Sequence, residues 1–212
     1  MDNQVDGMTL DAKTRLHHLL AIARKCSTLN ESIACKKGVE YLENYLPQFF
    51  THPASRSPLA HHHYVGGLAQ HTCEVIQIGL QIREIMRLKD AISYDGYFMA
   101  ALFHDAGKVP SYYQTKDGTW VKTQASRMFH HIYLSTQIFQ DMMAKMQLNY
   151  PEEITHAILA HHGCREWGSP VAPATPLAQL LHHSDMMSAR MNGIINGVDP
   201  LDYKKYKEDE KS

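Results

Sequence analysis

The sequence has little cysteine, and the cysteines that it has are scattered. Four occur among 212 residues, and no two have the C-x-x-C spacing. A disulfide-stapled scaffold or a thiolate zinc knuckle needs closely spaced, paired cysteines, so both classes are excluded. Few and unpaired thiols are typical of proteins in a reducing compartment, and we expect a cytoplasmic location.

The chain also lacks an excess of charge of one sign and long apolar runs. Its formal net charge is -1, so no overall basic field attracts nucleic acid, and any phosphate must be bound locally. No stretch approaches the roughly 18 continuous apolar residues of a membrane span. Residues 1–10 are polar and acidic where a signal peptide needs basic and then apolar residues. These absences predict a soluble protein without membrane association.

Histidine, in contrast, is abundant. Fifteen histidines occur, most of them doubled, and one adjoins an aspartate within the largely apolar run 99–108. Imidazole and carboxylate groups bind the same transition-metal cations. The composition therefore predicts a metal site, and the residues that stand out are His71, His104, Asp105, the histidine pairs at 130–131, 161–162 and 182–183, and Asp185.

Hydrophobic periodicity predicts helices along most of the chain. The turn signal Asp117-Gly118 favours a small hairpin within 112–122. The expected helices cover 10–29, 39–50, a stretch that starts just after Gly67, 97–104, 128–146, 151–162 and 175–191. In the helix after Gly67 the expected buried stripe consists of Val75, Ile78, Ile82, Ile85 and Met86.

These elements predict an all-α fold, a single-domain helical bundle. Residues 1–59 are expected to form N-terminal helices that pack on the same core as residues 60–198. The charged segment 199–212 has no apolar face and is expected to fray.

Helical spacing places two of the candidate ligands inside. His161 shares a helical face with Ile158, and Asp185 shares one with Leu181, so both should point toward the core. A buried carboxylate without a partner is unfavourable unless it becomes neutral. A cation removes that difficulty, and the neighbouring imidazoles lead to the same conclusion.

Each histidine also has a simpler explanation. A single buried histidine is usually a hydrogen-bonded core residue, and His182 and His183 could cap a helix or pack against Asp185. A purely structural account would need a separate reason for each histidine and aspartate of the set. The combination therefore favours the metal site.

Four segments, in this order, carry a resemblance to a known family. They read His61-His-His-Tyr-Val-Gly-Gly-Leu-Ala-Gln-His71-Thr, Leu102-Phe-His-Asp-Ala-Gly-Lys108, His161-His-Gly-Cys-Arg-Glu-Trp-Gly-Ser-Pro170 and His183-Ser-Asp-Met-Met-Ser-Ala-Arg190-Met. Over residues 60–192 the chain resembles the HD superfamily of metal-dependent phosphohydrolases, which implies an HD-type helical bundle.

Within that superfamily, segment 161–170 is most similar to the HD exoribonucleases that trim single strands from the 3′ end. Those enzymes carry an OB-fold nucleic-acid module ahead of the HD domain. Here residues 1–59 occupy that place, with a helical pattern and no excess of basic residues. The Gly-Gly-Leu-x-x-His passage is also similar to HD domains associated with conjugative-transfer relaxases.

The resemblance implies a site for two divalent metal ions, with Asp105 between them. The residues implied for the first ion are His71, His104, Asp105 and Asp185. Those implied for the second are His131 and His161, or their neighbours His130 and His162, since the register is open by one residue. Nitrogen and carboxylate ligands without sulfur suit manganese, iron, cobalt, nickel or zinc.

Further residues are expected to act on a substrate. Lys108, three residues after Asp105, could stabilise charge on phosphoryl oxygens, or be a solvated lysine at a helix end. Arg190 could bind a phosphate or form a surface salt bridge, and His62 could donate to the substrate or the leaving group. Trp167 could stack on a base or simply pack a loop.

The expected function is that of a metal-dependent phosphohydrolase. It would hydrolyse phosphomonoester or phosphodiester bonds of nucleotides or nucleic-acid ends through a metal-activated water. The substrate would be a nucleotide, another phosphate ester or a single-stranded nucleic acid. Two alternatives stay open, a non-catalytic HD module that senses a nucleotide or binds a partner, and a di-iron HD oxygenase. The oligomeric state is not predicted.

Overall fold

The structure is a computed structural model that describes residues 13–17, 20–21 and 29–197. Residues 13–17 and 20–21 are helical. The all-α fold expected from the periodicity is confirmed, with only one small sheet in the described part of the chain. The further elements are α2 (Leu29–Tyr45), the 3-10 helix η1 (Pro47–Phe50), α3 (Gly67–Ile85), α4 (Tyr94–Phe103), α5 (Lys108–Ser111), β1 (Tyr112–Gln114), β2 (Trp120–Lys122), α6 (Gln124–Met146), α7 (Glu152–Ala160), the 3-10 helix η2 (Arg165–Trp167) and α8 (Pro176–Ile195).

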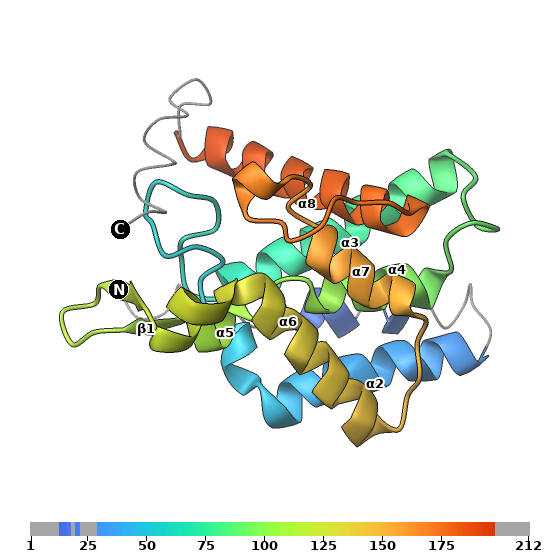
Figure 1. Cartoon of the computed structure of the whole chain (residues 1–212), viewed down its shortest axis with the longest axis horizontal. Coiled ribbons are helices and arrows are strands. Elements are labelled where there is room, and N and C mark those ends of the chain that lie inside the picture. The colour runs from blue at the N-terminus through green and yellow to red at the C-terminus, as the bar shows by residue number, and fades with distance from the viewer. Residues whose placement is uncertain (1–12, 18–19, 22–28, 198–212) are drawn as a thin grey trace.

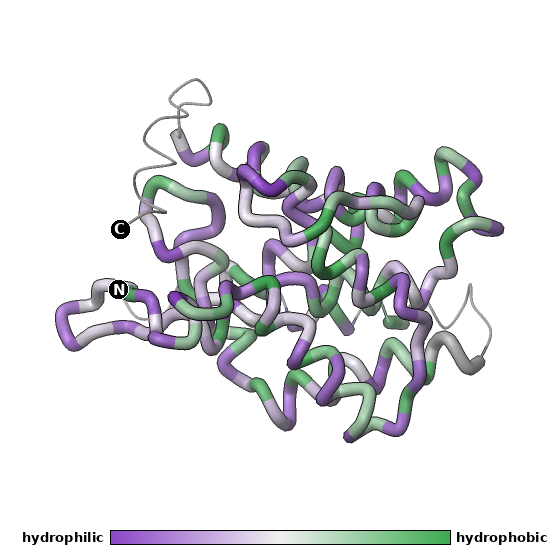
Figure 2. The backbone as a smooth tube through the Cα atoms, viewed as in Figure 1, coloured by the Kyte–Doolittle hydropathy of each residue, from purple (hydrophilic) through white to green (hydrophobic). Residues whose placement is uncertain are grey.

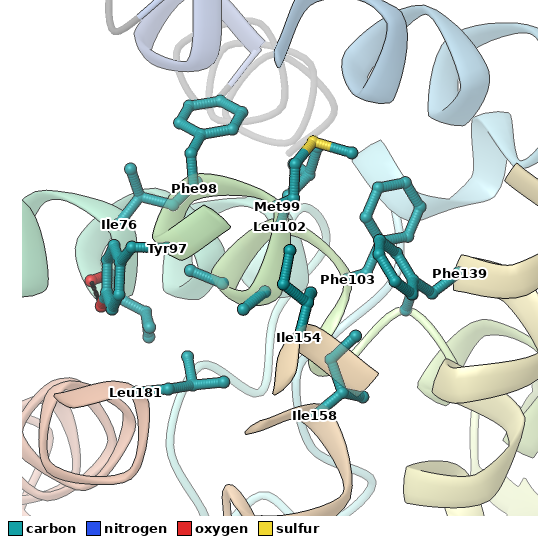
Figure 3. Packing of buried hydrophobic residues seen from close by; sticks show 14 of the residues in the cluster. Ile76, Tyr97, Phe98, Met99, Leu102, Phe103, Phe139, Ile154, Ile158 and Leu181 are labelled. Atoms are coloured by element: carbon teal, nitrogen blue, oxygen red, sulfur yellow. Dashed lines mark hydrogen bonds between the residues drawn. The ribbon is translucent and has the colours of Figure 1, made fainter. Parts of the chain in front are cut away.

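Helix α4 forms the centre of the fold because it is apolar on every side. The side chains from Tyr97 to Phe103 have no exposed surface. A helix that is hydrophobic all round has no face to present to water and must be surrounded by other elements. Figure 3 shows this packing, in which Phe103 meets Phe139 of α6, while α7 and α8 contribute Ile154, Ile158 and Leu181.

The other helices lie on different sides of α4. Helix α2 lies along one side of the molecule and α8 along the opposite side, with α3, α4 and α7 between them (Figure 1). Helix α3 packs against α4 and α8, and α7 packs against α4, α6 and α8. Residues far apart in the sequence therefore meet where these helices come together.

Side chains cap several helix starts. Ser93, Thr123 and Thr175 precede α4, α6 and α8, and each accepts a hydrogen bond from a backbone N–H three residues on. Such caps satisfy one of the donors that the first turn of a helix leaves without a partner. Helix α7 follows Pro151, and its first turn contains the acids Glu152 and Glu153, which complement the helix dipole.

Some predicted boundaries were wrong. The helix expected over 39–50 begins earlier, at Leu29, and ends at Tyr45, because Pro47 disfavours a helical conformation in the residue before it. Helix α6 begins at Gln124 and not at 128, since Thr123 supplies a cap. Most of the expected helix over 10–29 lies outside the described residues.

The buried face of α3 also differs from the prediction. Ile85 and Met86 are 77% and 63% exposed, although both were expected in the buried stripe. Val75 of that stripe is buried, but Ile78 and Ile82 are only half-buried. The physical reason is that α4 and α8 cover another side of the helix, whose buried residues include Leu68, Ala69, Thr72, Cys73, Ile76, Leu80 and Arg83.

The hairpin expected within 112–122 is confirmed. Strands β1 and β2 pair antiparallel, with Tyr113 opposite Val121. Gly118 lies in the turn with φ +88°, a conformation that glycine adopts without strain. The hairpin projects from one end of the molecule and is mostly hydrophilic (Figure 2).

One hydrophobic cluster includes residues of the N-terminal part together with the helices around α4. Leu16, Val39 and Phe49 belong to it, as do residues of α7 and α8. The segment 199–212, expected to fray, lies outside the described residues, and the division of the chain at 59 and 198 stays a prediction. Among the helices that the structure describes, none has the length and apolar character needed to cross a membrane.

Gly79 leaves room for a buried tyrosine, which gives a test of the packing between α3 and α4. The hydroxyl of Tyr97 donates to the carbonyl of Val75 at 2.8 Å, and a Cβ at Gly79 would overlap the Tyr97 ring. Gly79→Ala should lower the free energy of unfolding by about 3 kcal/mol, because the core would be overpacked. In an open helix the same change stabilises by about 1 kcal/mol.

Urea unfolding followed by circular dichroism measures this difference. Gln77→Ala, at an exposed position on the same helix, is the matched control and should change stability little. A Gly79→Ala protein as stable as the wild type would contradict the close contact between α3 and α4.

Candidate metal centre

Two helices end in a histidine that binds the carbonyl of its own last turn. Nδ1 of His104, at the end of α4, lies 2.7 Å from the Ala101 oxygen, and Nδ1 of His161, at the end of α7, lies 2.6 Å from the Ile158 oxygen. The last carbonyls of a helix lack a partner within the helix, so each imidazole satisfies one of them. A carbonyl only accepts, so each Nδ1 carries a proton, and Nε2 presents a lone pair whenever the ring is neutral.

His71, on α3, is oriented by two hydrogen bonds in series. Ser188 Oγ donates to Glu74 Oε2 at 2.8 Å, and it therefore accepts from Nδ1 of His71, 2.9 Å away. The lone pair of His71 Nε2 then faces Nε2 of His104 at 3.3 Å. Two lone pairs at this distance repel each other unless a proton or a cation lies between them.

Asp105 follows His104, is 2% exposed, and its two oxygens face different partners. Oδ2 lies 3.4 Å from Nε2 of His104 and 3.6 Å from Nε2 of His71. Oδ1 lies 3.3 Å from Nε2 of His131 and 3.6 Å from Nε2 of His161. One buried carboxylate therefore lies between two groups of imidazoles.

Each group has a further member. Asp185, on α8, places Oδ1 3.0 Å from Nε2 of His71. His162 donates from Nδ1 to the Trp167 oxygen at 2.6 Å, and it has a ligand atom within 4.8 Å of those of His131 and His161. We call His71, His104, Asp105 and Asp185 the first ligand group, and Asp105, His131, His161 and His162 the second ligand group.

The nitrogen and oxygen atoms that face one another in these groups are better suited to binding divalent ions than to hydrogen bonding with one another. Asp105 Oδ1, His131 Nε2 and His161 Nε2 are buried, and none has a hydrogen-bond partner within the part of the chain that the structure describes. Buried polar atoms without a partner are rare and costly in folded proteins. Ligands about 2.1 Å from one ion lie about 3.0–3.4 Å apart, which is close to the spacings seen here.

Lys108 balances the charge of Asp105. Its Nζ lies 2.6 Å from Asp105 Oδ2, and both side chains are buried. Burial by itself raises the pKa of Asp105, but the charges of Lys108 and His104 outweigh burial and hold that pKa well below its usual value. Burial lowers the pKa of Lys108, but the attraction of Asp105 outweighs it and raises that pKa. The two groups therefore keep each other ionised.

Several of the imidazoles are neutral at neutral pH. Burial lowers the pKa of His71 to about 4 and that of His162 to about 3, and it holds the pKa of His131 well below its usual value. The neutral imidazole is the form that binds a metal ion. Burial also acts on His104, but there the charges of Asp105 and Asp185 outweigh it and raise the pKa.

A kink in α6 distinguishes His131 from its neighbour His130. His130 has φ 62° and ψ 150° inside the helix, a conformation that is essentially confined to glycine. Its side chain is exposed, with the ring centre 4.3 Å from that of His131, whereas His131 is only 5% exposed and faces Asp105. Of the pair at 161–162, His161 is fully buried and approaches Asp105, while His162 lies beside it.

Sequence reasoning missed the residues that orient the ligands. Glu74 lies three residues after His71 on the same helix, and this helical spacing could have indicated that the two side chains are neighbours. Ser188 comes from α8, and no sequence pattern connects it with His71. Burial raises the pKa of Glu74, but the hydrogen bond from His62 outweighs it and the pKa falls to about 2. His182, for which capping a helix or packing against Asp185 was the simpler explanation, donates to the His161 carbonyl at 2.7 Å.

The residues expected to act on a substrate lie at different depths. Lys108 is buried against Asp105. His62 is 1% exposed, and its ring nitrogens approach Glu74 and His61. His61, His62 and His71 also form a third group of residues that could hold a metal ion. Arg190 is exposed, with Cζ 5.9 Å from the centre of the Trp167 ring. The substrate roles of Lys108, His62 and Arg190 stay predictions.

Comparison with protein families agrees with this geometry. The HD domain family matches residues 68–190, which is more than half of the chain. The chain belongs to the HD domain family. The matched span contains every member of the first and second ligand groups.

The chain is also similar to curated proteins described as 3′-5′ exoribonuclease YhaM. It is 30% identical to that of Oceanobacillus iheyensis, over 72% of this chain and 46% of that protein. It is 26% identical to that of a Geobacillus species, over 76% and 48% of the two chains, and 30% identical to that of Bacillus pumilus, over 71% and 46%. The chain therefore spans about half the length of the curated relatives it matches. No solved structure matches it.

The Glu74 carboxylate should control metal affinity without touching the metal. Glu74→Gln removes the charge of the carboxylate and one of the two acceptor oxygens that His62, Gln70 and Ser188 share, so the hydrogen bond that orients Ser188 toward Nδ1 of His71 is weakened. We expect the affinity for Mn²⁺ to fall about 10-fold to 100-fold, measured by isothermal titration calorimetry on metal-free protein. Glu84→Gln, an exposed position on the same helix, is the control, and equal affinities for the two variants would contradict the orienting role.

The backbone strain at His130 gives a test of the kink. In an ordinary helix, alanine is more stable than glycine by about 1 kcal/mol. At position 130 we expect the reverse, with His130→Gly more stable than His130→Ala by about 1–2 kcal/mol, because glycine adopts this conformation without strain. Urea unfolding of the two variants measures the order, and alanine being the more stable would show that α6 is not kinked at this residue.

Proposed function

We propose that the chain is a metal-dependent phosphohydrolase that cleaves phosphate esters at nucleic-acid ends and uses two divalent ions. The observation that carries the proposal is the buried carboxylate of Asp105, whose two oxygens face two separate groups of imidazoles. One carboxylate between two sets of nitrogen ligands suits a pair of ions a few Å apart, the arrangement of many phosphate-cleaving sites.

The two ligand groups define which residues would hold the ions. The first ion would be bound by His71, His104, Asp105 and Asp185, and the second by Asp105, His131 and His161, with His162 beside them. Nitrogen and oxygen ligands without sulfur suit manganese, iron, cobalt, nickel or zinc. When bound, such ions supply a polarised phosphoryl oxygen and an activated water.

The protein's own residues prepare this chemistry. Backbone carbonyls and Ser188 hold the imidazoles in one tautomer, so the ligand set needs little rearrangement to bind. The burial of Asp105 and its partners keeps bulk water away, which strengthens every electrostatic interaction at the site. Lys108, beside Asp105, adds a positive charge that we propose acts on the phosphoryl oxygens.

A nucleic-acid substrate is supported by the relatives named 3′-5′ exoribonuclease. The formal net charge of -1 means that a strand is not attracted by the surface as a whole, so it must be bound at the site and its rim. Among the described cysteines, Cys164 is a free thiol, which supports the proposed cytoplasmic location.

The test is metal content together with turnover. Metal per chain is measured by mass spectrometry, and the Mn²⁺-loaded protein is offered short single-stranded RNA and DNA, mononucleotides and a simple phosphate ester. We expect two ions per chain and shortening of strands from the 3′ end. Asp105→Asn should lose metal and at least about 100-fold in turnover, because it removes a ligand from both groups. Asp90→Asn, in an exposed loop, is the matched control.

The other results would each overturn part of the proposal. One ion per chain would show that His131 and His161 hold no second ion and serve only to pack the core. Two ions without turnover of any substrate would favour a nucleotide-sensing module. Oxygen consumption by the iron-loaded protein would favour an oxygenase.

A further inference from the structure

Trp167 is a large aromatic side chain that the hydrophobic core does not use. It is half-buried, and it belongs neither to the core cluster nor to the hydrophobic residues packed against that cluster. Its ring neighbours are polar, with the His182 ring centre 6.3 Å away at an interplanar angle of 30° and Arg190 Cζ at 5.9 Å. Packing of a loop onto the core therefore does not explain this indole.

The segment that carries Trp167 is tied to the second ligand group. The Trp167 carbonyl accepts the hydrogen bond from Nδ1 of His162, and Trp167 N–H donates to the Cys164 oxygen at 3.2 Å. Ser169 is 2% exposed and anchors the end of the segment, with its Oγ 3.0 Å from the Leu159 oxygen. The backbone that carries the indole is thus held in place, one hydrogen bond away from the imidazole of His162.

The same segment forms a rim with α6 and α8. Gly168 has φ +90°, and a Cβ there would lie 3.4 Å from the exposed His130 imidazole at the kink of α6. Arg190, which belongs to α8, lies over the Trp167 indole. The backbone of this segment therefore borders the second ligand group through His162, and Arg190 lies over the indole that the segment carries.

We propose that Trp167 and Arg190 form the subsite for the unpaired base of the nucleotide whose phosphate reaches the second ligand group. This proposal rests on the proposed function and names the feature of the substrate that the site selects. Bases stack on tryptophan with little regard to their identity, and an arginine stacks on bases as well as binding phosphate. A base already stacked within a duplex is not available to this pair, so the subsite selects single-stranded ends.

The kinetic test uses two short single strands that differ only at the 3′ end, where one has a base and the other an abasic nucleotide. Trp167→Leu should raise KM for the ordinary strand about 10-fold to 100-fold and leave KM for the abasic-ended strand unchanged. The value of kcat should stay the same for both strands, and Trp167→Phe should restore most of the affinity. Trp120→Leu, which changes the tryptophan of β2, is the matched control.

A binding test separates this proposal from the proposed function. In the Trp120→Phe protein Trp167 is the only tryptophan, since the chain has two. A nucleoside monophosphate should quench its fluorescence, and ribose 5-phosphate should not. If the wild type cleaves no strand, the proposed function fails, and quenching by the mononucleotide still decides the subsite.

Two results would overturn the subsite. An equal rise in KM for the two strands in Trp167→Leu would show that the indole does not contact the base. A loss of metal from this variant would show that Trp167 acts only by supporting His162.

Discussion

Asp105 is a buried carboxylate whose charge water scarcely reaches. An ionised carboxylate in this position is stable only if positive charge or hydrogen-bond donors surround it. Lys108 supplies one such partner, and imidazoles on α3, α4, α6 and α7 approach its two oxygens. The arrangement that packs these helices around α4 therefore also surrounds the Asp105 carboxylate with the partners that it needs.

The ends of two helices connect fold and chemistry. His104 and His161 each bind a carbonyl that their helix would otherwise leave without a partner, and the same bond turns Nε2 toward Asp105. Helix stability and ligand orientation thus depend on one hydrogen bond at each end. A shift of either helix by one residue would remove the bond and the ligand together.

Several energetically unfavourable features lie around the two ligand groups. The Nε2 atoms of His71 and His104 face each other, buried nitrogens of His131 and His161 have no hydrogen-bond partner among the described residues, and His130 has a backbone conformation that suits glycine. Natural proteins tolerate such conflicts where they serve a function, because the surrounding core supplies the stability. Here the fully buried residues of α4 and their neighbours provide that core.

Local patterns in the sequence were enough for the all-α class, the hairpin turn at Gly118 and the presence of histidine and aspartate groups that could hold a metal, since each depends on neighbouring residues or on composition. They were not enough for the buried face of α3, where Ile85 is exposed because α4 and α8 cover another side. Nor did they reveal that Ser188 joins Glu74 to His71, because 114 residues separate Ser188 from Glu74. Which of His130 and His131 faces Asp105 likewise depends on a kink that only the packed structure shows. Periodicity and composition are properties of the chain itself, whereas the face that a helix buries and the partner that a polar atom finds depend on which elements pack against it.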